Sequence, residues 1–84
     1  MSANTKVVEI GSTILLRMQN RTEKVTIVTP EKTDIFDGKI SINSPIGQAV
    51  LGCKKNDKVP VVLPDERKIN CIILKIDNKK KTLF

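Results

Sequence analysis

The sequence of 84 residues contains no histidine, tryptophan or tyrosine, and its only aromatic residues are Phe36 and Phe84. Without histidine, a Ser–His–Asp triad, a Cys–His pair and a histidine metal ligand are excluded. So few rings argue against a stacking surface for single-stranded nucleic acid. Any small-molecule pocket would be aliphatic and poorly suited to planar ligands. We therefore expect no catalytic residue, no cofactor, no small-molecule substrate and no enzymatic activity.

Long apolar runs and paired cysteines are also missing. The longest apolar runs have about four residues, against the roughly 20 that a membrane-spanning helix needs, and the N-terminus does not resemble a signal peptide. Cys53 and Cys71 form no C-x-x-C motif, so free thiols in a reducing cytosol are favoured over a disulfide or metal site. We expect a cytoplasmic protein that makes no membrane contact.

What the sequence does contain is positive charge, with a formal net charge of +6. A basic chain favours acidic partners such as nucleic acid, an anionic membrane or an acidic protein face, although the charge also serves solubility. Lys79, Lys80 and Lys81 are candidates for a weak nucleic-acid contact. Glu31, Asp34 and Asp37 lie among lysines at a spacing that fits no metal loop, so we expect a solvated loop and no metal site.

Alternating apolar residues predict a sheet-dominated α+β fold in a single domain that spans residues 1–84, with flexible ends at 1–5 and 78–84. Residues 68–77 are apolar on both faces, which indicates a central strand or a bulge that swaps faces. Pro60 lacks a backbone donor and points to an edge strand or an outward position. The predicted strands are 6–10, 13–18, 24–29, 39–42, 59–63 and 68–77.

The segment NSPIGQAVLG, residues 43–52, predicts one short helix at about 45–51. Ser44 suits the N-cap and Pro45 the first helical position, where its missing N–H costs nothing. Ile46, Ala49 and Val50 repeat at the spacing of one helix face. Gly52 is expected just beyond the C-terminus in the left-handed conformation. Two turns are too short to be stable alone, so the helix is expected to pack on the sheet.

The run Gly38 to Gly52, GKISINSPIGQAVLG, resembles the C-terminal domain of the bacterial Gre transcription elongation factors. Its pattern is similar to the family signature I-S-x-x-S-P-[IL]-[AG]-x-A-[LV]-[LI]-G. The flanks agree: residues 10–16 resemble the entering strand, and residues 56–59 resemble a G-D-x-V turn with Asn56 for glycine. The resemblance covers roughly residues 7–77 and implies an FKBP-like fold, a bent, mostly antiparallel sheet with one short helix.

In that family the domain docks on a coiled coil of the largest catalytic subunit of RNA polymerase, beside the secondary channel. The loop that enters the helix is a main contact. By position, the resemblance implies partner-binding roles for these residues: Asn43, Ser44 and Pro45, with Ser41, Ile46, Asp34 and Asp37 as neighbours.

Full Gre factors begin with a long helical hairpin whose acidic tip assists RNA cleavage, and only about six residues precede the matched region here. We therefore expect a polymerase-binding protein that modulates elongation or competes with Gre factors without stimulating cleavage. Three alternatives stay open. They are an FKBP-like prolyl isomerase, a basic nucleic-acid-binding domain, and a fragment of a longer factor.

Overall fold

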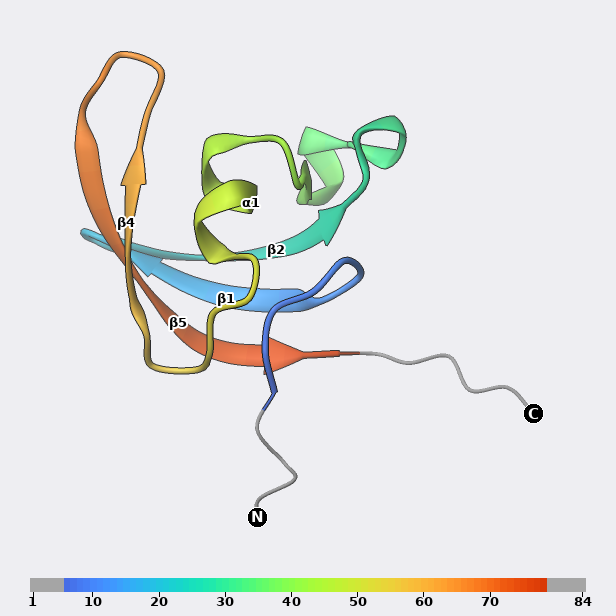
Figure 1. The fold of residues 1–84 in the computed structure, drawn as a ribbon, viewed down its shortest axis with the longest axis horizontal. Helices are drawn as coiled ribbons and strands as arrows, with labels where there is room; N and C mark the ends of the chain where they lie inside the picture. The colour runs from blue at the N-terminus through green and yellow to red at the C-terminus, as the bar shows by residue number, and fades with distance from the viewer. Residues whose placement is uncertain (1–5, 79–84) are drawn as a thin grey trace.

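The computed structural model describes residues 6–78, which form one five-stranded sheet in the order β3-β2-β1-β5-β4. Only the pair β2–β3 is parallel, so the predicted α+β class with a mostly antiparallel sheet is confirmed. The elements are β1 Thr13–Met18, β2 Arg21–Val28, the 3-10 turns η1 Pro30–Lys32 and η2 Ile35–Asp37, β3 Lys39–Ser41, α1 Pro45–Val50, β4 Lys58–Val62 and β5 Lys68–Asp77 (Figure 1).

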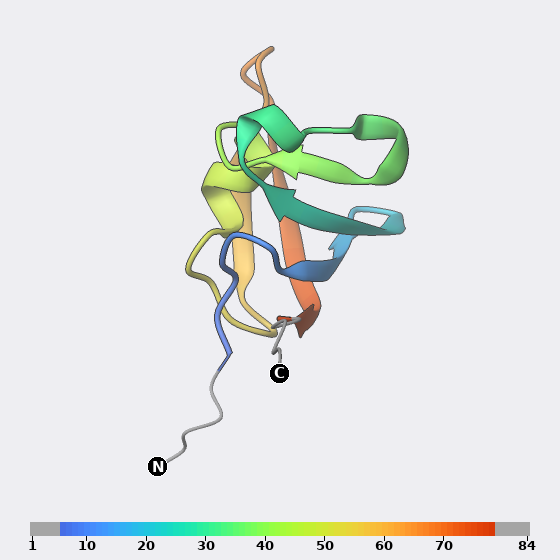
Figure 2. The same ribbon diagram turned by 90° about the vertical axis from the view of Figure 1, so that its right-hand side faces the viewer.

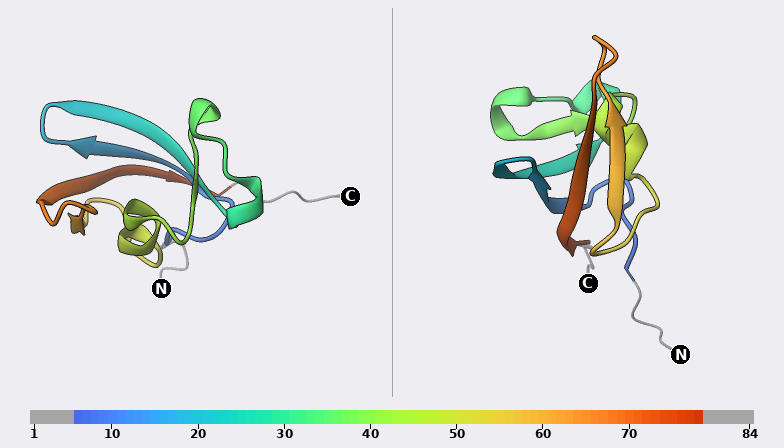
Figure 3. Two further views of the ribbon diagram at one scale, coloured as in Figure 1. Left: turned by 90° about the horizontal axis from the view of Figure 1, so that it is seen from above. Right: turned by 90° about the vertical axis from the view of Figure 1, so that its left-hand side faces the viewer.

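The sheet curls around the single helix, which lies on its concave side, as the view from above in Figure 3 shows. Side chains alternate along β1, with Ile14 and Leu16 fully buried and Arg17 exposed. This alternation gives the sheet an inner face toward α1 and an outer face. The core under the helix is aliphatic, as expected: Val8, Ile14, Leu16, Val25, Ile27, Val50, Val59, Val61, Cys71, Ile73 and Ile76.

Strand β5 is apolar on both faces, and the structure shows both of the explanations that the sequence left open. It lies between β1 and β4, and it contains a bulge. Leu15 pairs with Lys75 and Leu16 with Ile73, so Leu74 is an extra residue without a partner on β1. Because of the bulge, Ile76 is buried on the same face as Ile73, although the plain alternation of the sequence placed it opposite.

Residues 6–10 do not form the predicted strand. They make one isolated bridge, Val7 to Lys54, and two backbone bonds in which Val8 N–H donates to Cys53 O at 2.9 Å and Gly52 N–H donates to Val8 O at 2.9 Å. Val8 is almost fully buried, so its apolar character reflects packing beside the end of α1. The alternation of apolar and polar residues over positions 6–10 therefore indicated a partly buried, extended segment, and not a strand paired along its length.

The hairpin β1–β2 is tighter than predicted. Only Gln19 and Asn20 form the turn, because Met18 already pairs with Arg21 and the polar residues 21–23 belong to β2. Gln19 adopts a positive φ of 46°, as a two-residue hairpin turn requires. Residues 21–23 are polar because they lie at the solvent-exposed end of the hairpin, and not because they form a turn.

Two smaller predictions also have clear outcomes. β4 is an edge strand, as Pro60 indicated. Asn78 was expected in the flexible tail, but its Nδ2 donates to Val7 O at 3.1 Å, and its Oδ1 accepts from the hydroxyl of Ser12. This correction has a physical cause, because Ser12 is a fully buried polar side chain that needs a partner. The candidate lysines Lys79, Lys80 and Lys81 lie outside the described residues.

Candidate functional site

Two serines fix the turn that leads into α1. Ser44 is the N-cap: its Oγ accepts from Gly47 N–H at 3.0 Å and donates to Ser41 O at 2.7 Å. Ser41 Oγ accepts from Asn43 N–H at 2.8 Å. Each serine side chain therefore bonds to the backbone of the same short turn, so the turn is held in one conformation.

The predicted helix and its caps are confirmed, and they present two residues to solvent. Pro45 is the first helical residue, and Gly52 has a φ of 85° just beyond the helix end. Asn43 and Pro45 are exposed, whereas Ile46 is half-buried against the core. Asn43, Ser44 and Pro45 thus form a hydrogen-bonded turn anchored by Ile46. We call it the docking turn because the sequence resemblance predicts a docking role for it.

Gly47 holds the docking turn close to β3. A Cβ atom built on Gly47 would lie 2.1 Å from Ser41 O and 3.0 Å from Ile42 Cα, distances that a real side chain cannot occupy. The glycine is buried, and its missing side chain lets the helix backbone approach the end of β3 directly.

The two predicted carboxylates lie at the other end of β3. Asp34 caps η2, since its Oδ1 accepts from Asp37 N–H at 3.3 Å, and Asp37 forms an exposed ion pair with Lys39 at 3.3 Å. β3 separates them from the docking turn by about 10 Å of strand. Figure 2 shows η2 and α1 beyond opposite ends of β3. The predicted site residues are thus two groups, with Asp34 and Asp37 apart from Ser41 to Ile46.

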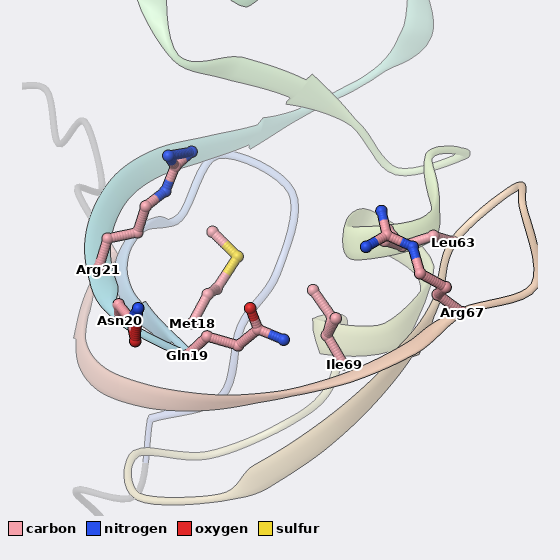
Figure 4. Close-up of a pocket in the computed structure, with 7 residues that line it drawn as sticks. All are labelled: Met18, Gln19, Asn20, Arg21, Leu63, Arg67 and Ile69. Atoms are coloured by element: carbon pink, nitrogen blue, oxygen red, sulfur yellow. The ribbon is translucent and has the colours of Figure 1, made fainter.

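A hollow on the inner face was not foreseen from the sequence (Figure 4). Its volume is about 300 Å³, and half-buried apolar side chains from three segments, Met18, Leu63 and Ile69, line it. Arg21 and Arg67 also line it and pair with Glu23 at 2.7 Å and Asp65 at 2.9 Å. No aromatic residue lines the hollow. It joins residues about 50 apart in sequence, and no local motif could have indicated it.

An exposed apolar turn was missed as well. In η2, Phe36 is 102% exposed and Ile35 is 75% exposed. The sequence placed both in a charged loop, but nothing in a loop sequence says which way a side chain points. Side chains this accessible make no contribution to the core, so the two residues form an exposed apolar surface.

Titration and metal chemistry add no reactive group. Burial raises the pKa of the Cys71 thiol, and burial followed by the charge of Asp57 raises the pKa of the Cys53 thiol. Both cysteines are free, and the raised pKa of each thiol disfavours its reactive thiolate form. Across residues 6–78, no group of three acidic, histidine or cysteine side chains could hold a metal ion.

Residues 3–78 match the family model described as "Transcription elongation factor, GreA/GreB, C-term". The chain belongs to this family. The sequence resemblance and the FKBP-like architecture expected from it are thereby confirmed. The Gre C-terminal family match spans both the docking turn and the hollow.

Curated relatives carry the same family name. The chain is 36% identical over 81 residues to transcription elongation factor GreA of Oenococcus oeni, with 94% of this chain and 50% of that protein covered. It is 46% identical over 59 residues to GreA of Streptococcus pyogenes serotype M5, with 68% and 37% covered. The chain thus spans half or less of the length of these Gre proteins.

Solved structures agree. GreA factor homolog 1 of Thermus thermophilus is 26% identical and superposes with a TM-score of 0.73, with 90% of this chain and 51% of that chain covered. The Thermus aquaticus Gfh1 structure is 25% identical with a TM-score of 0.77 and the same coverage. In the described part of this Gre-family chain, no helix is long and apolar enough to span a bilayer.

Proposed function

We propose that this chain is a non-enzymatic docking module for RNA polymerase. It binds the coiled coil of the largest catalytic subunit beside the secondary channel and competes there with full-length Gre factors. The observation that carries the proposal is the docking turn, an exposed Asn43-Ser44-Pro45 projection braced by serine hydrogen bonds. It lies in a chain whose family members are named transcription elongation factors.

The physics of the docking turn supports this role. Pro45 has a fixed φ, and the serine bonds already order the backbone, so little conformational entropy is lost when a partner binds. Asn43 adds an exposed amide that can both donate and accept hydrogen bonds. A rigid apolar and polar pair on one turn suits recognition of a helical surface.

The absence of cleavage stimulation is part of the proposal. The α-helix described in residues 6–78 has six residues, and nothing in this range resembles a long helical arm. The chain on its own would therefore occupy the polymerase site without contributing an acidic tip.

Binding to immobilised bacterial core polymerase tests the proposal. We expect saturable binding that full-length GreA displaces, and at least a tenfold loss of affinity, about 1.4 kcal/mol, for Asn43→Ala with Pro45→Ala. Asn20→Ala with Thr22→Ala, exposed at the β1–β2 hairpin and outside the predicted partner-binding set, is the control and should keep the wild-type affinity. Absent binding, or equal affinities of the wild type and the docking-turn variant, would refute the proposal.

A cleavage assay on backtracked complexes tests the competitor role. We expect no RNA cleavage from the chain alone and reduced cleavage when it is added before full-length GreA. Stimulated cleavage would contradict the role. A prolyl isomerase is not favoured, since the hollow on the inner face lacks aromatic side chains.

A further inference from the structure

The outer face of the sheet collects basic side chains. The pairs Leu16–Glu23 and Leu16–Ile73 put these three side chains on the inner face of the sheet. Because side chains alternate along a strand, the residues next to them in regular strand point to the outer face. Strand register continues this alternation across β4. The cations assigned to the outer face are Arg17, Lys24, Lys58, Lys68 and Lys75.

Cations outnumber carboxylates on this face. On β1, β2, β4 and β5, five cations stand against one strand carboxylate, Asp77, which leaves a formal excess of +4 on this part of the sheet. Asp77 is itself engaged in an interaction. Ion pairs between described residues use Arg21, Lys39 and Arg67, so none of the five outer cations is neutralised there. The five outer cations are thus available to an acidic partner.

Three lysines meet around a hollow on this side. Lys24, Leu15 and Lys75 are direct neighbours across β2, β1 and β5, which puts the two lysine positions about 10 Å apart. Lys6 also lines the hollow, whose volume is about 420 Å³. Each of the three lysines is exposed. Three lysines from three segments and one carboxylate, Asp77, thus line the hollow.

Neutral donors accompany the charge. The hydroxyls of Thr13 and Thr26 lie 2.9 Å apart on the outer face, and since one proton satisfies that bond, the other hydroxyl keeps a proton to donate. Hydroxyls and lysines are usual partners of phosphate oxygens. The outer face carries no aromatic residue in its strands, so base stacking cannot contribute.

We propose that the outer face binds the phosphate backbone of nucleic acid without reading its sequence. Its cations spread over four strands, which suits an extended polyanion better than a single small anion. The carboxylates Glu31, Asp34 and Asp37, in or beside η1 and η2, border the sheet next to β3, so the proposed contact runs over β2, β1, β5 and β4. This face lies opposite α1 and does not include the docking turn (Figure 3).

Fluorescence anisotropy with a labelled duplex and a single strand of about 20 nucleotides tests the proposal. With about four phosphate contacts on duplex DNA, the affinity is expected to fall about a hundredfold between about 50 mM and about 200 mM salt. Arg17→Gln, Lys24→Gln and Lys75→Gln together should weaken binding at least about tenfold and flatten the salt dependence by about one unit of slope per contact.

The matched control removes the same number of charges elsewhere. This control is the triple variant Lys54→Gln, Lys55→Gln and Arg67→Gln. Two of its positions are in the loop after α1 and one is in the β4–β5 turn. It should change the affinity by no more than about threefold. Absent binding at low salt, equal losses in both triple variants, or binding restricted to one base sequence would overturn the proposal. The assay contains no polymerase, so its result is independent of docking.

Discussion

Gly47 shows how a single missing side chain sets the position of the docking turn. In most helices, replacement of glycine by alanine stabilises by about 1 kcal/mol because alanine has the better helix propensity. At Gly47 the space for a Cβ atom is already taken by the backbone of Ser41 and Ile42. At this residue the packing therefore opposes the better helix propensity of alanine. Because a Cβ atom would lie only 2.1 Å from Ser41 O, the packing is the larger effect.

We predict that Gly47→Ala destabilises the fold by about 1–3 kcal/mol, because α1 must move away from β3. Thermal unfolding followed by circular dichroism measures the change. Gln48→Ala, an exposed position in the same helix, is the control and should stay within about 0.5 kcal/mol of the wild type. A Gly47→Ala protein as stable as the control would show that α1 does not approach β3 this closely.

At the scale of the element, α1 depends on its surroundings. Six residues cannot sustain a helix in water, because nucleation costs more than two turns return. The helix persists because Val50 is fully buried in the core and the Ser44 cap satisfies a free backbone donor. The same cap bonds to Ser41 O, so it also joins the helix to β3.

We predict that Ser44→Ala lowers the free energy of unfolding by about 1 kcal/mol, equivalent to about 4–8 °C in Tm for a domain of this size. Ser44→Asp should recover part of the loss, since a carboxylate can accept from Gly47 N–H but cannot donate to Ser41 O. Equal Tm values for wild type and Ser44→Ala in calorimetry would contradict the capping role.

The elements that sequence reasoning located correctly are those with strong local signals. The cap, Pro45 and Gly52 fixed the helix within one residue. The apolar residues of β5 indicated a central position or a bulge, and the structure has both. The strand at residues 6–10 was wrong because alternation reports burial and not a hydrogen-bonded neighbour. The separation of Asp34 from the docking turn, and the hollow between Met18 and Ile69, depend on how distant segments fold together.

At the scale of the whole molecule, one buried polar group links the two ends of the described chain. Ser12 is fully buried, and its Oγ accepts from Glu9 N–H at 2.8 Å and donates to Asn78 Oδ1. Asn78 in turn donates to Val7 O at 3.1 Å. The segment before β1 is therefore tied to the end of β5, and no buried side-chain nitrogen or oxygen between residues 6 and 78 lacks a partner.

We predict that Ser12→Ala costs about 1–3 kcal/mol, because Glu9 N–H and Asn78 Oδ1 lose a partner in a dry environment. A double-mutant cycle with Asn78→Ala in urea should give a coupling energy of about 0.5–3 kcal/mol. Asn70→Ala, at an exposed position of β5, is the comparison and should be additive with Ser12→Ala. A coupling energy of zero for Ser12 and Asn78 would remove the link.

The extra residue at Leu74 also limits how this sheet can be altered. Upstream of it, odd-numbered side chains of β5 enter the interior, and downstream an even-numbered one, Ile76, does so. If β5 paired with β1 without the bulge, Leu74 would lie opposite Leu15 and Lys75 opposite Ile14. Lys75 would then point inward and Ile76 would meet water, whereas deletion of Leu74 would leave both side chains on their present faces. A graft or chimera that joins a regular strand to β5 must therefore allow for the one extra residue, because otherwise every side chain beyond the join changes face.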